Sequence, residues 1–448
     1  LHAPFFRSTK LQNLIGKYGL KVLRIGILAE ISIDRQNVDV RQLATAKSRS
    51  CTYIRIPQHL NRFMPLKNVV FVLLFLTSFL GFGQTSDTIT KDEKKVSLSG
   101  FVTSAITGEA LISARIYIPA LKKGVLSNNY GFYSLTVPAD TYLVEYRYTG
   151  LENTIQQIEL NEDTQLDVEI GSKLQKLNEV KVNASKGDNV NSTKIGQIEL
   201  EVEKIKTLPA FMGEVDVIKI IQLLPGVNSA TEGGQGFYVR GGGPDQNLVL
   251  LDEAVVYNAA HLFGFFSVFN VDAIKSVNLI KGGMPAKFGG RISSVLEVQM
   301  NEGNSKEFKV KGGLGAISSR LTVEGPINKG KGSFIASGRR TYIDVIMKAA
   351  IPDDSPFSGS SYFFYDFNFK ANYKLGAKDK IFLSGYYGRD EFSFVNTDDE
   401  FNVQMPWGNA IASLRWNHVF NNKLFMNATL TSTDYLFSFG SEQDEFRF

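Results

Sequence analysis

The sequence predicts a mainly β protein with a small N-terminal β-sandwich, a compact α+β domain and an incomplete antiparallel transmembrane β-barrel. Three observations support this prediction. Short alternating strands separated by turn residues fill residues 96–172. One apolar helical face and a glycine-rich stretch lie within residues 191–303. From residue 304 to residue 448 the helical period disappears, and long strands alternate polar with large apolar side chains.

The uneven charge distribution argues against a nucleic-acid partner. The formal net charge is +4, but residues 1–63 contain 11 Lys/Arg and 3 Asp/Glu, whereas the rest of the chain contains 38 and 42. Nucleic-acid-binding domains usually carry a clear basic excess. Residues 1–63 show no sustained hydrophobic period. We interpret them as a disordered extension upstream of the true start of the protein.

The stretch "MPLKNVVFVLLFLTSFLGFGQ", which begins at Met64, has the pattern of a secretory signal peptide. One lysine precedes an apolar run, and a small-x-small triplet ends at Gly83, so we expect cleavage between Gly83 and Gln84. The run is too short for a membrane-spanning helix, which needs about 18 or more apolar residues. The sequence therefore predicts a signal peptide over residues 64–83 and an exported protein.

The residues that usually carry enzyme or metal chemistry are scarce and scattered. The single cysteine, Cys51, precedes Met64, so the exported chain has neither a disulfide framework nor a thiolate metal site. We expect His261 and His418 to be packed or loop histidines rather than metal ligands. The acidic stretches 352–354 and 397–400 are interpreted as solvated loop charge. We therefore expect no enzyme activity, no catalytic residues, no cofactor and no metal site.

Residues 96–172 predict the β-sandwich. Turn signals such as Thr107-Gly108 and Asn128-Asn129-Tyr130-Gly131 separate its short strands, and we expect antiparallel pairing. A sandwich of this kind carries no chemistry by itself, so it serves as a binding or spacer module. Apolar side chains alternate at Ala114, Ile116 and Ile118, and again at Tyr142, Val144, Tyr146 and Tyr148.

The α+β domain begins with "FMGEVDVIKIIQLLPGV", in which Val217, Ile218, Ile221 and Leu224 share one helical face. It continues with "GFYVRGGGPDQNLVLLDEAVVYN", residues 236–258. A phosphate-binding loop requires a helix N-terminus after its glycines, but the strand "NLVLLD" follows here. We therefore predict a structural turn, with Arg240 and Asp252 in a salt-bridge or hydrogen-bond network. The residues of this motif are Arg240, Gly241, Gly242, Gly243 and Asp252.

The strands after residue 304 have the length and alternation of an outer-membrane barrel. In "YDFNFKANYKL", residues 365–375, apolar and polar side chains alternate without a fault. Short connections are expected at 326–332, 376–379 and 421–423, and long ones at 346–360 and 391–408. Outer-membrane barrels have short periplasmic turns and longer external loops. The alternative is a soluble all-β repeat. The strands are predicted near 306–316, 317–325, 333–345, 361–375, 380–390, 409–420 and 424–439.

These stretches resemble known families. "SGFVTSAITGEALISARIYI…SNNYGFYSLTVPADTYLVEYRYTG" resembles the carboxypeptidase-regulatory-like domain, which is not catalytic despite its name. "IQLLPGV…GQGFYVRGGGPDQNLVLLDEAVVYN", with the sequence that follows it up to "GGRISSVLEV", resembles the plug domain of TonB-dependent outer-membrane receptors. The resemblance is greatest to the subgroup with a fused carboxypeptidase-regulatory-like domain. Plugs of this family commonly have Asp-Gly where this chain has Asp252-Glu253, so the turn there is expected to differ.

The resemblance implies a receptor that takes up a nutrient ligand with energy from the inner membrane. It places the chain in the outer membrane, with its N-terminal domain in the periplasm. An anchored sensor or adhesion protein is the alternative. The stretch "LNEVKVNA" in the linker 173–190 occupies the place of the TonB box, whose expected residues are Leu177, Asn178, Glu179, Val180, Lys181 and Val182.

The same resemblance implies the partners of the chain. They are TonB, outer-membrane lipid and a small nutrient ligand, with a surface lipoprotein as a further candidate. The ligand class stays open among siderophores, glycans, peptides and vitamins. The strands are too few to close a barrel of about 22 strands, the size that needs a plug. We therefore expect the chain to be an N-terminal fragment of a longer receptor.

Overall fold

The computed structural model describes residues 28–32, 94–171, 196–206, 214–229, 236–398, 400–443 and 446–447. The predicted signal peptide, with its cleavage site at Gly83 and Gln84, and the predicted TonB box over residues 177–182 lie outside these residues. Within the described ranges, no helix combines the length and hydropathy needed to span a bilayer. The predicted mainly β architecture is confirmed.

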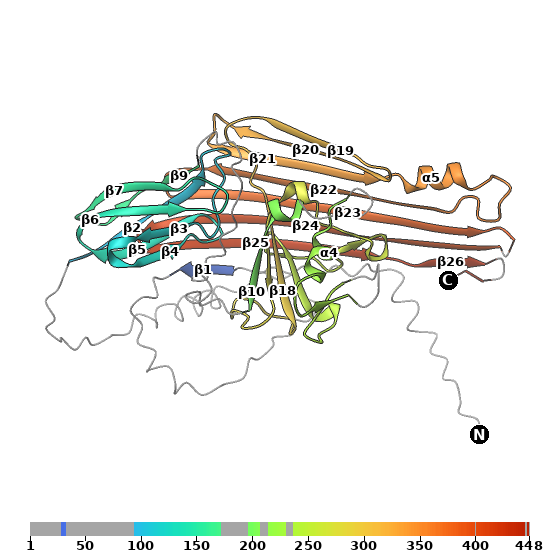
Figure 1. Ribbon diagram of the computed structural model, residues 1–448. Helices are drawn as coiled ribbons and strands as arrows, with labels where there is room; N and C mark the ends of the chain where they lie inside the picture. The colour runs from blue at the N-terminus through green and yellow to red at the C-terminus, as the bar shows by residue number, and fades with distance from the viewer. Residues whose placement is uncertain are drawn as a thin grey trace, which may run out of the picture.

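A long antiparallel sheet, here called the wall, forms the C-terminal part of the chain (Figure 1). Its strands follow one another in space from β25 to β19 as a meander, which is the order expected of an incomplete up-and-down barrel. β24 also pairs with β26, which in turn pairs with β27. The strands are β19 (Lys309–Leu314), β20 (Ser318–Ile327), β21 (Gly332–Thr341), β22 (Ser361–Lys374), β23 (Asp379–Asn396), β24 (Phe401–Asn421), β25 (Leu424–Phe437), β26 (Gly440–Gln443) and β27 (Phe446–Arg447).

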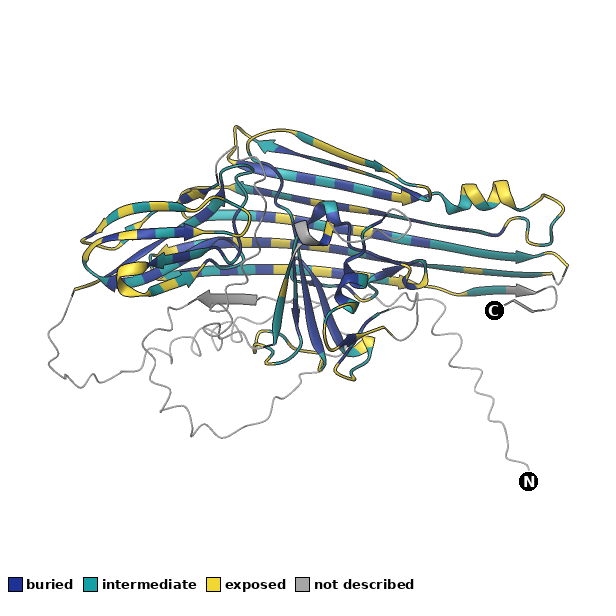
Figure 2. Cartoon of the chain, in the orientation of Figure 1, coloured by how far each residue is buried: buried dark blue, intermediate teal, exposed yellow. Residues whose placement is uncertain are grey.

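The two faces of the wall differ in chemistry, and Figure 2 shows the alternation as bands of buried and exposed residues along each strand. On β22, Asp366 is fully buried whereas the neighbouring Phe367 is 57% exposed. The polar side chains therefore face the α+β domain, and the large apolar ones face outward. Exposed apolar side chains of the outward face also include Leu383, Tyr387, Leu414, Trp416, Leu430 and Leu436.

The prediction of one long loop in the wall was wrong. Residues 391–408 are mostly strand, because β23 extends to Asn396 and β24 begins at Phe401, which pairs with Asn396. The proline at 406 had suggested a loop. It is tolerated because it lies between Gln404, which pairs with β26, and Trp407, which pairs with β25. The other predicted long connection contains the short helix α5 (Ile343–Ala350).

Residues 94–171 form the sandwich, which has two four-stranded sheets. Its core contains Leu98, Ile116, Leu135 and Val144, all fully buried. The pairing is not purely antiparallel as predicted, because β2 pairs in parallel with β8 and β9. The strands are β2 (Lys95–Ser104), β3 (Arg115–Ile118), β4 (Lys123–Leu126), β5 (Phe132–Pro138), β6 (Asp140–Arg147), β7 (Thr154–Leu160), β8 (Thr164–Gln165) and β9 (Val168–Ile170), with the 3₁₀ helix η2 (Pro119–Leu121).

The α+β domain, residues 196–303, contains a five-stranded sheet in the order β10-β17-β18-β13-β14. Helix α4 (Val217–Gln222) begins where Asp216 accepts a hydrogen bond from the backbone N–H of Lys219. The domain also has short helices and bridges: α3 (Val202–Lys206), β11 (Val227–Asn228), β12 (Tyr238–Val239), η3 (Pro244–Gln246), β15 (Ala260–His261), η4 (Leu262–Gly264), β16 (Phe266–Ser267) and η5 (Val271–Ala273). The sheet strands are β10 (Gln197–Glu201), β13 (Asn247–Leu251), β14 (Ala254–Val255), β17 (Ile274–Ile280) and β18 (Ser294–Met300).

The α+β domain packs on the buried face of the wall, and the sandwich lies at the end of the wall that carries its short turns (Figure 1). The segment predicted to be a disordered extension contributes one strand, β1 (Leu28–Ser32), which pairs with β25 from Phe425 to Thr429. The rest of residues 1–63 lies outside the described residues, so the expected disordered extension stays a prediction. The free edge of β25 offers unpaired N–H and C=O groups, which explains why an extended segment pairs there.

Candidate functional site

The glycine-rich stretch forms a tight turn. The backbone N–H of Gly242 donates to the carbonyl of Val239 over 2.9 Å, and Arg240 and Gly241 both have positive φ, 50° and 87°. A Cβ atom on Gly242 would lie 2.3 Å from Oγ of Ser293, so this position requires glycine. After Gly243 come one turn of 3₁₀ helix and then β13. The turn therefore lacks the helix N-terminus that a phosphate site needs.

Asp252 is the buried acid of the motif, and its partner lies on the wall. Its carboxylate is 3.0 Å from Nζ of Lys370 and accepts the N–H of Met300 over 3.1 Å. Burial alone would raise the pKa of Asp252, but Lys370 and Arg415 lower it below its ordinary value. Arg240 is exposed, and among the described residues it forms no ion pair with Asp252. The backbone N–H of Arg240 instead donates to the carbonyl of Gly226 over 3.2 Å.

Glu253 occupies the position where plugs of the resembling family commonly have glycine. Its φ of 71° is left-handed, a conformation that glycine adopts more easily. The carboxylate accepts hydrogen bonds from the Tyr130 hydroxyl and from Nδ2 of Asn427, and it lies 3.5 Å from Arg415. Burial raises the pKa of Glu253, but Arg415 and hydrogen bonds from Thr429 and Tyr130 lower it overall. The departure from the family pattern therefore comes with side-chain contacts that glycine could not make.

A second buried network surrounds His261. Its Nδ1 lies 2.6 Å from Asp390 and its Nε2 lies 3.3 Å from Asp366, both on the wall. The imidazole stacks on Phe364 at 4.1 Å between centroids. Arg339 pairs with Asp366 over 2.5 Å and donates to the carbonyl of Ser267 over 2.8 Å. His261 is thus a packed histidine that joins the α+β domain to the wall.

The remaining polar contacts follow a common pattern in which acids of the α+β domain meet bases of the wall. Glu302 is 2.8 Å from Lys380 of the wall and 3.0 Å from Lys275. Arg320 of the wall is 2.8 Å from Asp272 and 3.2 Å from Glu214. Sequence reasoning missed these pairs because the partners lie far apart along the chain. The polar positions of the alternating strands were the only signal that pointed to them.

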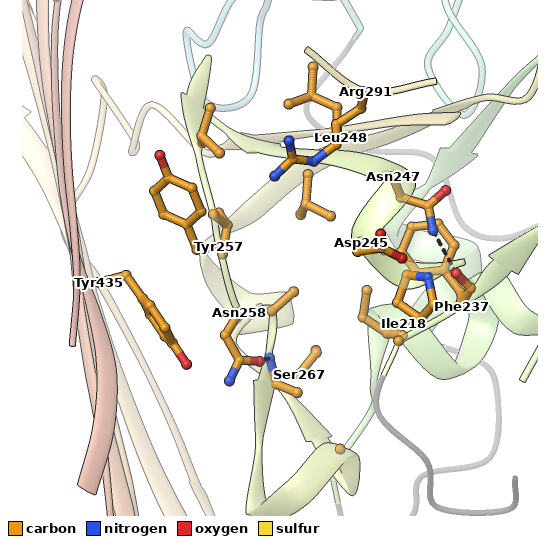
Figure 3. Close-up of a pocket in the computed structure, with 18 of the residues that line it drawn as sticks. Ile218, Phe237, Asp245, Asn247, Leu248, Tyr257, Asn258, Ser267, Arg291 and Tyr435 are labelled. Carbon is orange, nitrogen blue, oxygen red and sulfur yellow. Dashed lines mark hydrogen bonds between the residues drawn. The ribbon is translucent and has the colours of Figure 1, made fainter. Parts of the chain in front are cut away.

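A pocket of about 360 Å³ lies between the α+β domain and β25 (Figure 3). Tyr257 of the α+β domain and Tyr435 of β25 lie next to each other on one side of it, with ring centroids 6.4 Å apart, and Asn258 also lines it. Asn247 lies on the opposite side of the pocket and donates through Nδ2 to the carbonyl of Phe237 over 2.6 Å. The volume lies within the range of small-molecule sites, and aromatic faces beside amide groups suit a small organic ligand.

The arrangement defines a class of protein: a strand wall with an apolar outer face, and a separate domain that fills its polar inner face. Family models identify both globular domains. Residues 98–182 match the CarboxypepD_reg-like domain, and residues 204–295 match the TonB-dependent receptor plug domain. The chain therefore carries the plug domain of TonB-dependent receptors together with an N-terminal CarboxypepD_reg-like domain. Receptors with this plug domain are outer-membrane proteins rather than enzymes, and their plug and N-terminal domain face the periplasm. The α+β domain is called the plug below.

The solved structures with similarity to this chain include a siderophore receptor and an outer-membrane transporter. The siderophore receptor PirA from Pseudomonas aeruginosa has 16% identity and a TM-score of 0.37, covering 56% of this chain and 43% of that one. The outer-membrane transporter YddB from Escherichia coli has 12% identity and a TM-score of 0.41, with coverage of 56% and 40%. The chain thus spans less than half the length of these proteins.

Proposed function

We propose that the chain serves TonB-dependent uptake of a nutrient ligand across the outer membrane, with energy supplied from the inner membrane. The observation that carries this proposal is the interface between plug and wall. Ion pairs and hydrogen bonds such as Asp252–Lys370 and His261–Asp390 join the two across it. Water can replace such contacts when the plug shifts, whereas a purely apolar interface would resist hydration.

The predicted TonB box, residues 177–182, would be the segment on which TonB pulls, because it lies between the sandwich and the plug in the sequence. The pocket beside Tyr257 and Tyr435 is the proposed capture site for the ligand. It joins the plug to a wall strand, so a bound ligand would contact both, and a displaced plug would release it.

Deletion of residues 177–182 tests the coupling. Cells that produce the full chain would be supplied with labelled ferric siderophores, glycans, peptides and vitamins. Uptake of the transported class is expected to fall to background, whereas binding to the cell surface persists. A matched deletion of residues 185–190 in the same linker should leave uptake unchanged. If no class depends on 177–182 but adhesion or signalling persists, the anchored sensor or adhesion protein replaces this proposal.

Substitutions in the pocket test the capture site. Tyr257→Ala and Tyr435→Ala are each expected to weaken binding of the transported ligand about ten-fold, because aromatic side chains that a ligand covers often dominate binding energy. Tyr387→Ala, on the outward face of the wall, is the matched control and should leave binding unchanged. Unchanged binding in both pocket variants would place the capture site elsewhere.

A further inference from the structure

The turn Asn128–Gly131 of the sandwich holds one tyrosine rigidly. Oδ1 of Asn128 accepts the backbone N–H groups of Tyr130 over 2.9 Å and Phe132 over 3.0 Å. Gly131 has a φ of 78°, and a Cβ there would lie 2.7 Å from the carbonyl of Val102. Tyr130 packs outside the core of the sandwich, yet it is only 7% exposed. Its burial therefore comes from another part of the chain.

The wall supplies the apolar part of that burial. Phe425 of β25 stacks on Phe132 at 5.0 Å and on Tyr130 at 5.7 Å between centroids, and Phe101 meets it edge-on at 6.4 Å. Val419 of β24 belongs to the same cluster. Three aromatic side chains of the sandwich thus surround one phenylalanine at the turn end of the wall.

The plug supplies the polar part. The Tyr130 hydroxyl donates to the carboxylate of Glu253, and Nδ2 of Asn427 donates to the Tyr130 oxygen over 2.6 Å. The guanidinium of Arg415 lies 5.1 Å from the centroid of the Tyr130 ring and 3.5 Å from Glu253. Sandwich, plug and wall therefore meet at a single tyrosine. The left-handed backbone of Glu253 makes sense here, because its side chain receives that tyrosine.

The sandwich makes a second contact, with the segment that connects plug and wall, residues 302–306. Oε1 of Glu109 accepts the N–H groups of Glu302 over 2.7 Å and Gly303 over 3.0 Å. Nζ of Lys306 lies 2.8 Å from Glu169 and donates to the carbonyl of Ala105 over 2.9 Å. The sandwich thus binds the plug at its Asp252-Glu253 turn and also where the plug continues into the wall.

We propose that the sandwich is a second domain, besides the plug, that blocks passage through the receptor. It docks on the turn end of the wall and holds the plug in place through Tyr130 and Glu253. The sandwich ends before the predicted TonB box and the plug begins after it, so a pull on that segment acts on both domains. Release of the sandwich then precedes or accompanies displacement of the plug. This last step rests on the proposed uptake function, whereas the docking does not.

Release of the sandwich after cleavage of the linker tests the docking. A specific protease site would be inserted between Ser185 and Lys186 of the full chain and cut in isolated outer membranes. The freed sandwich is expected to stay with the membranes. Tyr130→Phe and Glu253→Gly should each speed its release about 10- to 100-fold, the effect of losing a buried hydrogen bond to a charged group.

Tyr117→Phe is the matched control, since it changes a sandwich tyrosine outside the Tyr130 cluster. It should release the sandwich at the rate of the unsubstituted chain. Tyr130→Phe leaves the sandwich core intact, so a faster release reports docking rather than unfolding. Immediate loss of the unsubstituted sandwich, or equal retention in all variants, would overturn the proposal. Hydrogen exchange of the β13 amides should also rise once the sandwich is gone, and unchanged exchange would contradict its hold on the plug.

A reversible cross-link tests whether the docked sandwich blocks uptake. Oγ of Ser134 lies 2.6 Å from the carbonyl oxygen of Asn422, so Ser134→Cys with Asn422→Cys, in a Cys51→Ser background, would pin the sandwich to the wall. Oxidised cells are expected to lose uptake at least about ten-fold, and a reductant should restore it, while each single cysteine has no effect. Normal uptake by the cross-linked receptor would overturn the proposal that the docked sandwich blocks passage. If even the unsubstituted chain transports nothing, the uptake function fails, and the release assay alone still decides the docking.

Discussion

Asp252 shows how one side chain connects plug and wall. It is buried and paired with Lys370, so both charges are kept out of water and depend on each other. Lys370→Met would leave Asp252 without its partner, and the cost is about 3–5 kcal/mol of plug stability. Urea unfolding of the chain in detergent measures it. Arg340→Met is the control, because its pair with Asp344 is solvent-exposed and is worth at most about 1 kcal/mol. Equal losses in both variants would contradict the assignment.

The environment of His261 predicts that the stability of the interface between wall and plug depends on pH. Burial lowers the pKa of His261, but Asp390 and Asp366 outweigh it and raise the pKa above its ordinary value. The charged imidazole therefore stabilises the docked plug fully below the ordinary histidine pKa of about 6.5, and this stabilisation is lost as pH rises through the raised pKa. Arg339, Tyr362 and Tyr386 also face this network.

The measurement is the urea midpoint of the plug across that window. It should fall in the unsubstituted chain as pH rises above the ordinary histidine pKa of about 6.5, and it should be flatter and lower in His261→Gln, which carries no titrating group there. Parallel curves for the two proteins would show that His261 does not control the interface.

At the level of elements, strand β22 shows what the alternation of side chains determines. The period of two in residues 365–375 predicted a strand with a polar and an apolar face, and both faces are found. It could not predict that the polar face meets a folded domain rather than water. That depends on partners such as Asp252 and Lys370, which lie 118 positions apart. Likewise, Pro406 suggested a loop because its tolerance depends on where neighbouring strands end.

The outward face of β24 yields a prediction that depends on depth. Leu414 lies near the middle of the strand and is 50% exposed, so Leu414→Arg would place a charge at the level of the lipid interior. We expect a loss of about 2–4 kcal/mol in folding into vesicles. His418→Arg, closer to the turn, should cost at most about 1 kcal/mol. Equal effects at the two positions would mean that this face does not contact lipid.

For the whole molecule, three parts with different chemistry depend on one another. The wall offers a polar face that would be costly to bury alone, the plug supplies opposite charges, and the sandwich contacts both at Tyr130. The family models cover the sandwich and the plug, and the sequence predicted both from strand periods and motif order. The contacts between the parts could not be predicted from sequence patterns, since each depends on side chains from separate domains. The predicted TonB box lies outside the described residues and stays a prediction.

The central claim is that the wall separates lipid from the plug. A cysteine scan over residues 365–373 of β22, in a Cys51→Ser background, tests it most directly. Each variant of the full chain in outer membranes would be exposed to a lipid-soluble and a water-soluble thiol reagent. We predict that Phe367 and Phe369 positions react only with the lipid-soluble reagent. Positions 366, 368 and 370 should be protected from both until urea displaces the plug. Reaction of the Phe367 and Phe369 positions with the water-soluble reagent, at the rate of an exposed loop, would contradict the account.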